Sequence, residues 1–295
     1  HKALQYNTTG CYNTAIGPGS LNLNTTGANN TVIGYYPMYY NTTGTDNTAL
    51  GYQALYQNVS GNHNFAAGNK ALCKNWGGCY NQAIGFRALE CNATGSQNTA
   101  LGQYALRSNT TGGCNNAIGR SSLSTNTEGA HNTAIGYAAM QDNTTGCYNA
   151  AIGYVALCSN TTGLYNTAIG SEALGYNTTG CYNAAIGKRA LYCNTTGSCN
   201  TALGYNALYT SLSGCHNFAA GSQALYSNWG GNYNTGIGEY ALYGNTTGKD
   251  NIALGTRALF TNTTGDFNNA IGCCALRGNT TGDANTAMGY GALQG

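Results

Sequence analysis

Apolar and polar residues recur along the chain with a fixed spacing of seventeen positions. Numbered from Asn13, each phrase follows the consensus N-T-A-I-G-Y-x-A-L-Y-x-N-T-T-G-C/x-Y, where x is variable. The first-position Asn and the fifth-position Gly return without exception, from Asn13 and Gly17 to Asn285 and Gly289, with no insertion or deletion between them. Repetition at a fixed period predicts a solenoid built from stacked, near-identical units.

The phrase predicts short strands joined by turns. Each phrase contains two Gly and a cluster of Asn and Thr, which are poor residues for a helix interior. We expect N-T-A-I-G to form one strand, x-A-L-Y a second strand, and N-T-T-G a corner whose Gly tolerates a positive φ. Stacking such units in register predicts an all-β fold, a parallel β-solenoid or β-roll with one phrase per coil and about seventeen coils.

Two atypical phrases indicate which side chains share a face. Asn64–Gly68 and Asn217–Gly221 both read N-F-A-A-G, so each loses the aliphatic fourth residue and gains a Phe at the second position. Positions two and four of a strand lie on the same side, and the exchange conserves volume there, as a close-packed interior requires. We therefore predict that positions two and four point into the coil. Position three, which is Ala in fifteen of seventeen phrases, then faces a closely packed second sheet or lies at a tight bend.

The sequence also has a longer repeat, which spans nine phrases. Residues 46–78 reappear as residues 199–231 with 23 of 33 positions identical, an offset of 153 residues or nine phrases. The two copies share an N-W-G-G corner, and we expect Trp76 and Trp229 to mark a lateral contact made once in nine coils. Because the chain begins and ends within a phrase, we expect residues 1–295 to be one continuous array cut from a longer chain.

The fraction of charged residues in the chain is low. Charged residues make up 7% of the chain and the formal net charge is +2, against about a quarter charged residues in an average globular domain. The few Lys and Arg are scattered, so we expect no nucleic-acid partner. No apolar run approaches the ~20 residues of a membrane-spanning helix, so we expect no membrane insertion.

The repeat offers little to catalysis, which requires a unique and asymmetric group of residues. Acidic residues are scattered over the phrases, and three of the four His stand at the same phrase position in distant phrases. The sequence shows no Ser/His/Asp set, phosphate-binding loop or Asp-rich calcium repeat. We expect no enzyme activity, no catalytic or metal site and no cofactor.

Cysteine is abundant, and eleven of the thirteen residues flank the N-T-T-G corner. Three pairs recur at near-equal spacing between successive phrases, although pairs that bridge one corner, such as Cys73 with Cys79, compete with them. A zinc site is less favoured because the pairs lack a CxxC spacing and supporting His. Disulfides would indicate an oxidising, extracellular setting. The candidate disulfides are Cys79 with Cys91, Cys147 with Cys158, and Cys181 with Cys193.

The Asn of N-T-T-G begins an N-glycosylation sequon, Asn-x-Ser/Thr, in thirteen phrases. Two interpretations stay open: the corner carries a column of glycans, or the Asn amides stack as a hydrogen-bonded ladder. The candidate glycosylation sites are Asn7, Asn24, Asn41, Asn58, Asn92, Asn109, Asn143, Asn160, Asn177, Asn194, Asn245, Asn262 and Asn279.

Tyr recurs at phrase positions six, ten and seventeen, as in Tyr52, Tyr56 and Tyr80. Rings one coil apart would stack and stabilise the solenoid. The same columns could form a carbohydrate-binding surface. We favour the structural ladder and keep carbohydrate as a candidate partner.

The segment N-T-A-I-G, or N-T-A-L-G at Asn47–Gly51, followed by x-A-L, resembles the head repeats of trimeric autotransporter adhesins. It is also similar to repeats in some phage and giant-virus fibre proteins. The resemblance covers the whole chain. It implies a left-handed parallel β-roll, usually trimeric and exposed on the surface of a cell or virion.

These features together predict a structural subunit of an extracellular fibre, located outside the cell or on a cell or virion surface. We expect it to be braced by disulfides, N-glycosylated at the corners, and associated with itself end to end or laterally, with a trimer as one arrangement. The first alternative is a surface adhesin or viral tail-fibre module that binds host glycans through its Tyr columns. The second is an ice-binding solenoid, since columns of Thr on a flat face can order water, although paired Thr at a corner count against it.

Overall fold

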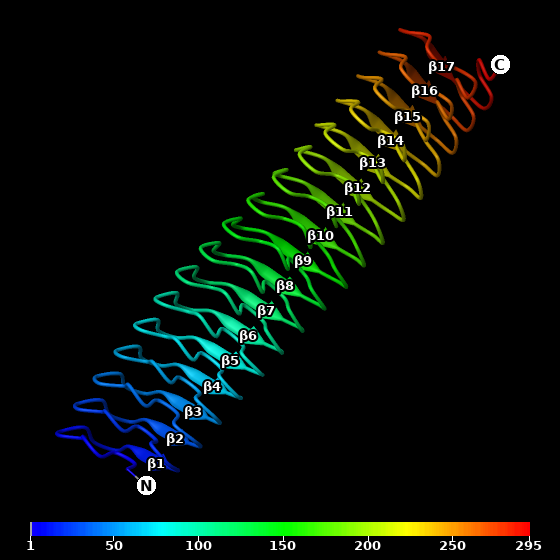
Figure 1. The fold of residues 1–295 in the computed structure, drawn as a ribbon. Helices are drawn as coiled ribbons and strands as arrows, with labels where there is room; N and C mark the ends of the chain where they lie inside the picture. Colours follow the sequence, from blue (N-terminus) through cyan, green and yellow to red (C-terminus); the bar gives the residue numbers. More distant parts are fainter. Residues whose placement is uncertain (1) are drawn as a thin grey trace. The chain divides into compact units, whose positions relative to one another are not determined.

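The computed structural model describes residues 2–295, which form strands and turns and no helix. The chain contains two compact units, a first unit His1–Tyr148 and a second unit Asn149–Gly295. In both units each phrase makes one coil, and the strands recur at the same place on successive coils (Figure 1). The prediction of an all-β parallel solenoid with one phrase per coil is confirmed, whereas one continuous array over residues 1–295 stays a prediction.

Each coil carries one strand of three residues, at phrase positions two to four. The strands of the first unit are β1 (Thr14–Ile16), β2 (Thr31–Ile33), β3 (Thr48–Leu50), β4 (Phe65–Ala67), β5 (Gln82–Ile84), β6 (Thr99–Leu101), β7 (Asn116–Ile118) and β8 (Thr133–Ile135). Those of the second unit are β9 (Ala150–Ile152), β10 (Thr167–Ile169), β11 (Ala184–Ile186), β12 (Thr201–Leu203), β13 (Phe218–Ala220), β14 (Thr235–Ile237), β15 (Ile252–Leu254), β16 (Asn269–Ile271) and β17 (Thr286–Met288). Within a unit each strand pairs in parallel with the next, in a register of one phrase, so that Ala168 lies opposite Ala185.

Hydrogen bonds between successive coils continue outside the strands. The N–H of Leu174 donates to the carbonyl oxygen of Ala190 at 2.9 Å, and the N–H of Thr178 donates to that of Thr195 at 2.9 Å. Turns and corners are therefore paired between coils as well as strands, which satisfies backbone groups that a three-residue strand alone would leave unpaired.

Position three, rather than positions two and four, faces the interior of the coil. Ala168 and Ala185 are fully buried, whereas Ile169 and Ile186 are 38% and 43% exposed. The Phe of the atypical phrases also points outward, since Phe65 is 36% exposed. The predicted facing of the strand was wrong. Phe and the aliphatic residue do share a side, but it is the outer side.

Ala and Leu from x-A-L-Y fill the space that position three faces. Leu225 and Ala241 are fully buried. A Cβ atom added to Gly236, which replaces the usual Ala of position three, would lie 3.3 Å from Leu225 Cγ and 3.2 Å from the Ala241 carbonyl oxygen. The strand and the Leu approach so closely that a small side chain is required between them. This accounts for the Ala column, in place of the second sheet or bend that the sequence suggested.

The segment x-A-L-Y is a turn and not the second strand that we predicted. Its first and third residues have left-handed backbone angles, as at Arg189 (φ 56°) and Leu191 (φ 50°). Such angles are costly for residues other than Gly. Each of the two donates its N–H to a neighbouring coil, Arg189 to the Ser171 carbonyl at 3.0 Å and Leu191 to that of Ala207 at 2.9 Å. Stacking therefore holds the backbone in this conformation and directs Leu inward.

The two Gly of the phrase are both required by close approach between coils. The fifth-position Gly has a positive φ, which is +132° at Gly170, and a Cβ there would lie 2.6 Å from the Gly187 carbonyl oxygen. The Gly of N-T-T-G, which would tolerate a positive φ, does not take one. A Cβ on Gly44 would nevertheless lie 2.6 Å from the Gly61 carbonyl oxygen, a distance that a side chain cannot occupy.

Candidate functional site

The outer side of the strands carries a strip of aliphatic residues at phrase position four. Register pairing places Ile169 opposite Ile186 and repeats this contact from coil to coil. We call these residues the outer strip. In the first unit they are Ile16, Ile33, Leu50, Ala67, Ile84, Leu101, Ile118 and Ile135. In the second unit they are Ile152, Ile169, Ile186, Leu203, Ala220, Ile237, Leu254, Ile271 and Met288. Ten of these side chains are exposed and the other seven are partly exposed. Exposed apolar surface of this kind is typical of interaction sites.

Phrase position two lies beside the outer strip and mixes Thr with other residues. Thr167 and Thr201 stand there in β10 and β12, but Phe218 and Ile252 interrupt the column in β13 and β15. Both interrupting side chains are exposed, at 36% and 40%. The unbroken column of Thr that the ice-binding alternative needs is therefore not present on this side, and Phe218 and Ile252 make the outer side more apolar at their own coils.

Both Asn of the phrase are buried in hydrogen-bonded ladders. Nδ2 of Asn177, at phrase position twelve, donates to Oδ1 of Asn160 at 2.9 Å and to the Gly180 carbonyl oxygen at 3.0 Å. Nδ2 of Asn183, at phrase position one, donates to Oδ1 of Asn166 at 3.2 Å. The ladder interpretation of the corner Asn is thus present in the folded chain.

The position-twelve ladder bears on the candidate glycosylation sites, because a glycan is attached to Nδ2. Asn7 and Asn279 are partly exposed. The other eleven sites are fully buried, namely Asn24, Asn41, Asn58, Asn92, Asn109, Asn143, Asn160, Asn177, Asn194, Asn245 and Asn262. A glycan on any of these would replace one of the two Nδ2 hydrogens and remove a hydrogen bond of the ladder, so the geometry disfavours occupancy, which stays a prediction.

All thirteen cysteines are free thiols in the structure. The pairs Cys79 with Cys91, Cys147 with Cys158 and Cys181 with Cys193 are therefore not bonded there, and disulfide formation between them stays a prediction. In the structure, backbone and Asn hydrogen bonds hold successive coils together without disulfides.

Position sixteen gives Cys a role that the sequence analysis missed. Sγ of Cys181 accepts a hydrogen bond from the N–H of Leu164 in the preceding coil at 3.4 Å. Oγ of Ser198 accepts one from the N–H of Cys181 at 3.0 Å, and Oδ1 of Asp266 accepts one from the N–H of Lys249 at 2.7 Å. Cys, Ser, Asp and Asn at this position thus serve as alternative acceptors for one N–H of the preceding coil. The signal was their alternation at one phrase position.

The aromatic columns stack as predicted. At position ten, the ring centroids of Tyr209 and Tyr226 are 5.0 Å apart with an interplanar angle of 8°, and those of Tyr226 and Tyr243 are 5.0 Å apart at 15°. At position seventeen, His216 stacks on Tyr233 at 4.9 Å. Parallel rings one coil apart add apolar and π contacts to the backbone pairing.

The two Trp of the N-W-G-G corners are exposed. Trp76 is 57% exposed in the first unit and Trp229 is 58% exposed in the second. Large exposed aromatic side chains are common anchors of protein contacts. The lateral contact that we assigned to them stays a prediction.

No helix within residues 2–295 is long and apolar enough to cross a membrane. The same span brings together no three His, Cys, Asp or Glu side chains that could hold a metal ion. No protein-family model, curated protein or solved structure matches the chain. The likeness to adhesin heads rests on the repeated residues and on the β-solenoid.

Proposed function

We propose that the protein is a structural subunit of an extracellular fibre whose copies associate side by side through the outer strip. The observation that carries the proposal is the row of exposed aliphatic side chains, such as Ile169 and Ile186, on successive coils. The apolar interior of each coil holds Ala and one Leu or Met, which is a thin core for a chain of this length. Covering the outer strip would add roughly 25 cal/mol for each Å² of apolar surface removed from water.

A second copy of the chain matches the outer strip better than an unrelated partner does. Both copies would repeat at the strand spacing of ~4.8 Å, so a contact made by one coil could recur at the next. No strand in the described chain contains Lys, Arg, Asp or Glu, so burying the strip desolvates no charged strand residue. The resemblance to trimeric adhesin heads adds a three-fold arrangement on a cell or virion surface to the proposal. Disulfides and corner glycans would be additions to this assembly and are not needed for it.

The outer strip can be tested by placing charge on it. In Ile186→Lys the new side chain points away from the coil interior, so the coil should fold as before. We expect the wild-type chain to sediment as an oligomer and the variant as a monomer, with unchanged circular dichroism. Thr196→Lys, at an exposed corner, is the matched control and should remain oligomeric. A wild-type monomer at micromolar concentration, or equal association of Ile186→Lys, would refute the proposal.

Recognition of a surface glycan is a second candidate function. The observation that favours it is a pocket bordered by Tyr154, Tyr176 and Tyr192 on the outside of the second unit. Aromatic side chains with hydroxyl groups offer both an apolar face and hydrogen-bonding capacity to a ligand.

A further inference from the structure

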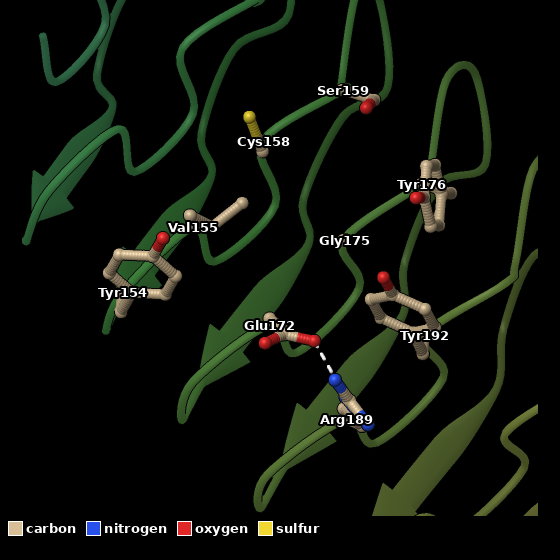
Figure 2. A pocket seen from close by; sticks show the side chains of 9 residues that line it. All are labelled: Tyr154, Val155, Cys158, Ser159, Glu172, Gly175, Tyr176, Arg189 and Tyr192. Carbon is tan, nitrogen blue, oxygen red and sulfur yellow. Dashed lines mark hydrogen bonds and ion pairs between the residues drawn. The ribbon is translucent and has the colours of Figure 1, made fainter.

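The position-ten aromatic column of the second unit begins next to a gap. Tyr192, Tyr209, Tyr226 and Tyr243 occupy position ten in four successive coils, but the coil before them has Gly175 there. A pocket of about 430 Å³ lies at Gly175 (Figure 2). This volume falls in the range of small-molecule sites. The pocket exists because one phrase lacks the side chain that the next four supply.

Aromatic side chains border the pocket. Figure 2 shows Tyr154 at one end and Tyr192 at the other, with Gly175 between them. Tyr192 is held in place by its neighbours. The ring centroids of Tyr192 and Tyr176 are 4.9 Å apart, with an interplanar angle of 73°. The guanidinium carbon of Arg189 lies 5.6 Å from the centroid of the Tyr192 ring. A hydrogen bond with Tyr176 is the largest cause that raises the pKa of Tyr192. The pocket therefore has a fixed, neutral aromatic wall.

The polar side of the pocket is an ion pair. Nε of Arg189 donates to Oε2 of Glu172 at 2.6 Å, and this hydrogen bond raises the pKa of Arg189. The pair carries no net charge, so the pocket favours a neutral ligand. A carboxylate has several acceptor positions, and Glu172 retains the capacity to accept from a ligand hydroxyl. The hydroxyls of Ser159 and Tyr176 add groups that both donate and accept.

We propose that this pocket binds one ring of a neutral saccharide. The C–H face of the sugar would lie against Tyr192, and its hydroxyls would pair with Glu172 and Ser159. The inference rests on the second candidate function, glycan recognition, and is independent of association through the outer strip. A phenolic ring, which would continue the Tyr column, is the competing ligand. A phenol has only one hydroxyl, so it would leave most polar groups of the pocket without a partner.

Gly175→Tyr is the sharpest test because it supplies the residue that position ten has in the following coils. The new Cβ would lie 3.0 Å from Tyr192 Cε2, so Tyr192 must shift slightly as the added ring fills the pocket. We expect wild-type protein to bind at least one of galactose, glucose and N-acetylglucosamine in ligand-observed NMR, with a dissociation constant on the order of 1 mM. Gly175→Tyr should weaken this binding by about tenfold or more. Ser124→Tyr places Tyr at position ten of the first unit and should bind as the wild type does.

Glu172→Gln gives a second test that preserves the shape of the pocket. It should weaken sugar binding by roughly threefold to tenfold through loss of a charged acceptor, with circular dichroism unchanged. Binding of none of the three sugars to the wild type, or equal binding by Gly175→Tyr, would overturn the proposal. Binding of phenol in place of the sugars would assign the pocket to aromatic ligands and also overturn it. Sedimentation of the same samples reports the outer strip separately, so failure of one proposal is distinguishable from failure of the other.

Discussion

Asn194 and Ser211 occupy position twelve in successive coils, and the hydrogen bond that links neighbouring Asn elsewhere in this ladder is missing between them. Oδ1 of Asn194 and Oγ of Ser211 are both buried without a hydrogen-bond partner. The ladder resumes further on, where Nδ2 of Asn245 donates to Oδ1 of Asn228 at 2.7 Å. A buried polar atom without a partner costs about 1 to 3 kcal/mol, so Ser211 is a weak point in the second unit.

Ser211→Asn should repair the ladder. The new Nδ2 would reach Oδ1 of Asn194, and the new Oδ1 would accept from Nδ2 of Asn228. We expect the free energy of unfolding in urea to rise by about 1 to 3 kcal/mol, with slower amide hydrogen exchange in the adjoining coils. Asn177→Ser, the reverse change in an intact part of the ladder, should lower stability by a similar amount. Lower stability in Ser211→Asn would contradict this account.

Substitutions in β10 test which side of the strand is buried. Ala168→Asp places a carboxylate in the interior of the coil and should lower the free energy of unfolding by at least about 3 kcal/mol. Thr167→Asp, on the outer side of the same strand, should change it by less than about 0.5 kcal/mol. Urea unfolding of both variants, at a concentration where the protein is monomeric, checks the prediction. Equal destabilisation by the two would contradict the inward facing of position three.

The strand could be located from the sequence, but the side that it buries could not. The exchange of Phe65 with Ala67 shows correctly that positions two and four share a side. The exchange keeps the total apolar volume of positions two and four. An outer strip can require this as well as an interior can, so the exchange does not show which side of the strand is buried. The more informative signal was the size of position three, since a column of Ala indicates a close approach. The opposing Leu could not be placed because Leu191 takes a left-handed angle that Leu rarely adopts alone and that stacking imposes.

The candidate sites also include some that the sequence could predict and one that it could not. Recurring positions such as the Tyr column and the Asn ladder could be predicted because each residue stacks on its own copy. The pocket at Gly175 depends on a departure from the consensus Tyr of position ten. Other phrases also depart from it, as at Ser124 and Cys158, so Gly175 carries no signal in the sequence until Tyr192 and Glu172 are seen around it.

Substitutions of Cys181 test whether its thiol acts as an acceptor or in a disulfide. If Sγ serves mainly as the acceptor for the N–H of Leu164, Cys181→Ser should keep the free energy of unfolding within about 0.5 kcal/mol, and Cys181→Ala should lower it by about 1 kcal/mol. Reductant should leave the wild-type stability unchanged. A thiol titration of the unfolded, non-reduced chain supplies the second measurement: fewer than thirteen reactive thiols would show that disulfides form.

The thiol of Cys73 should make stability depend on alkaline pH. Burial, with the charge of Glu90 second, raises its pKa to about 11 from an ordinary value of 9.0, although Lys70 and Lys74 oppose this. The unfolded chain therefore loses the proton at lower pH than the folded chain does. The contribution of the protonated thiol to the free energy of unfolding is complete below pH 9. It is lost between pH 9 and about 11, and the loss is at most about 2 to 3 kcal/mol.

Cys73→Ala isolates this effect from the other groups that titrate in the same range. Urea unfolding at several values between pH 8 and about 11 should show a smaller loss of stability in the variant than in the wild type. Parallel pH profiles of the two proteins would show that the thiol is not linked to folding.

In-register stacking makes one coil equivalent to the next, and this affects how such a chain can change in length. Excising residues 166–182 as a block would bring Ala151 opposite Ala185, a pairing of the same kind as those on either side. Losing a single residue would instead leave one coil short and offset its Gly and Asn from those of the neighbouring coils, where a Cβ meets a carbonyl oxygen. Unequal recombination between repeats can thus lengthen or shorten the gene in whole-phrase steps without the protein having to find a new fold.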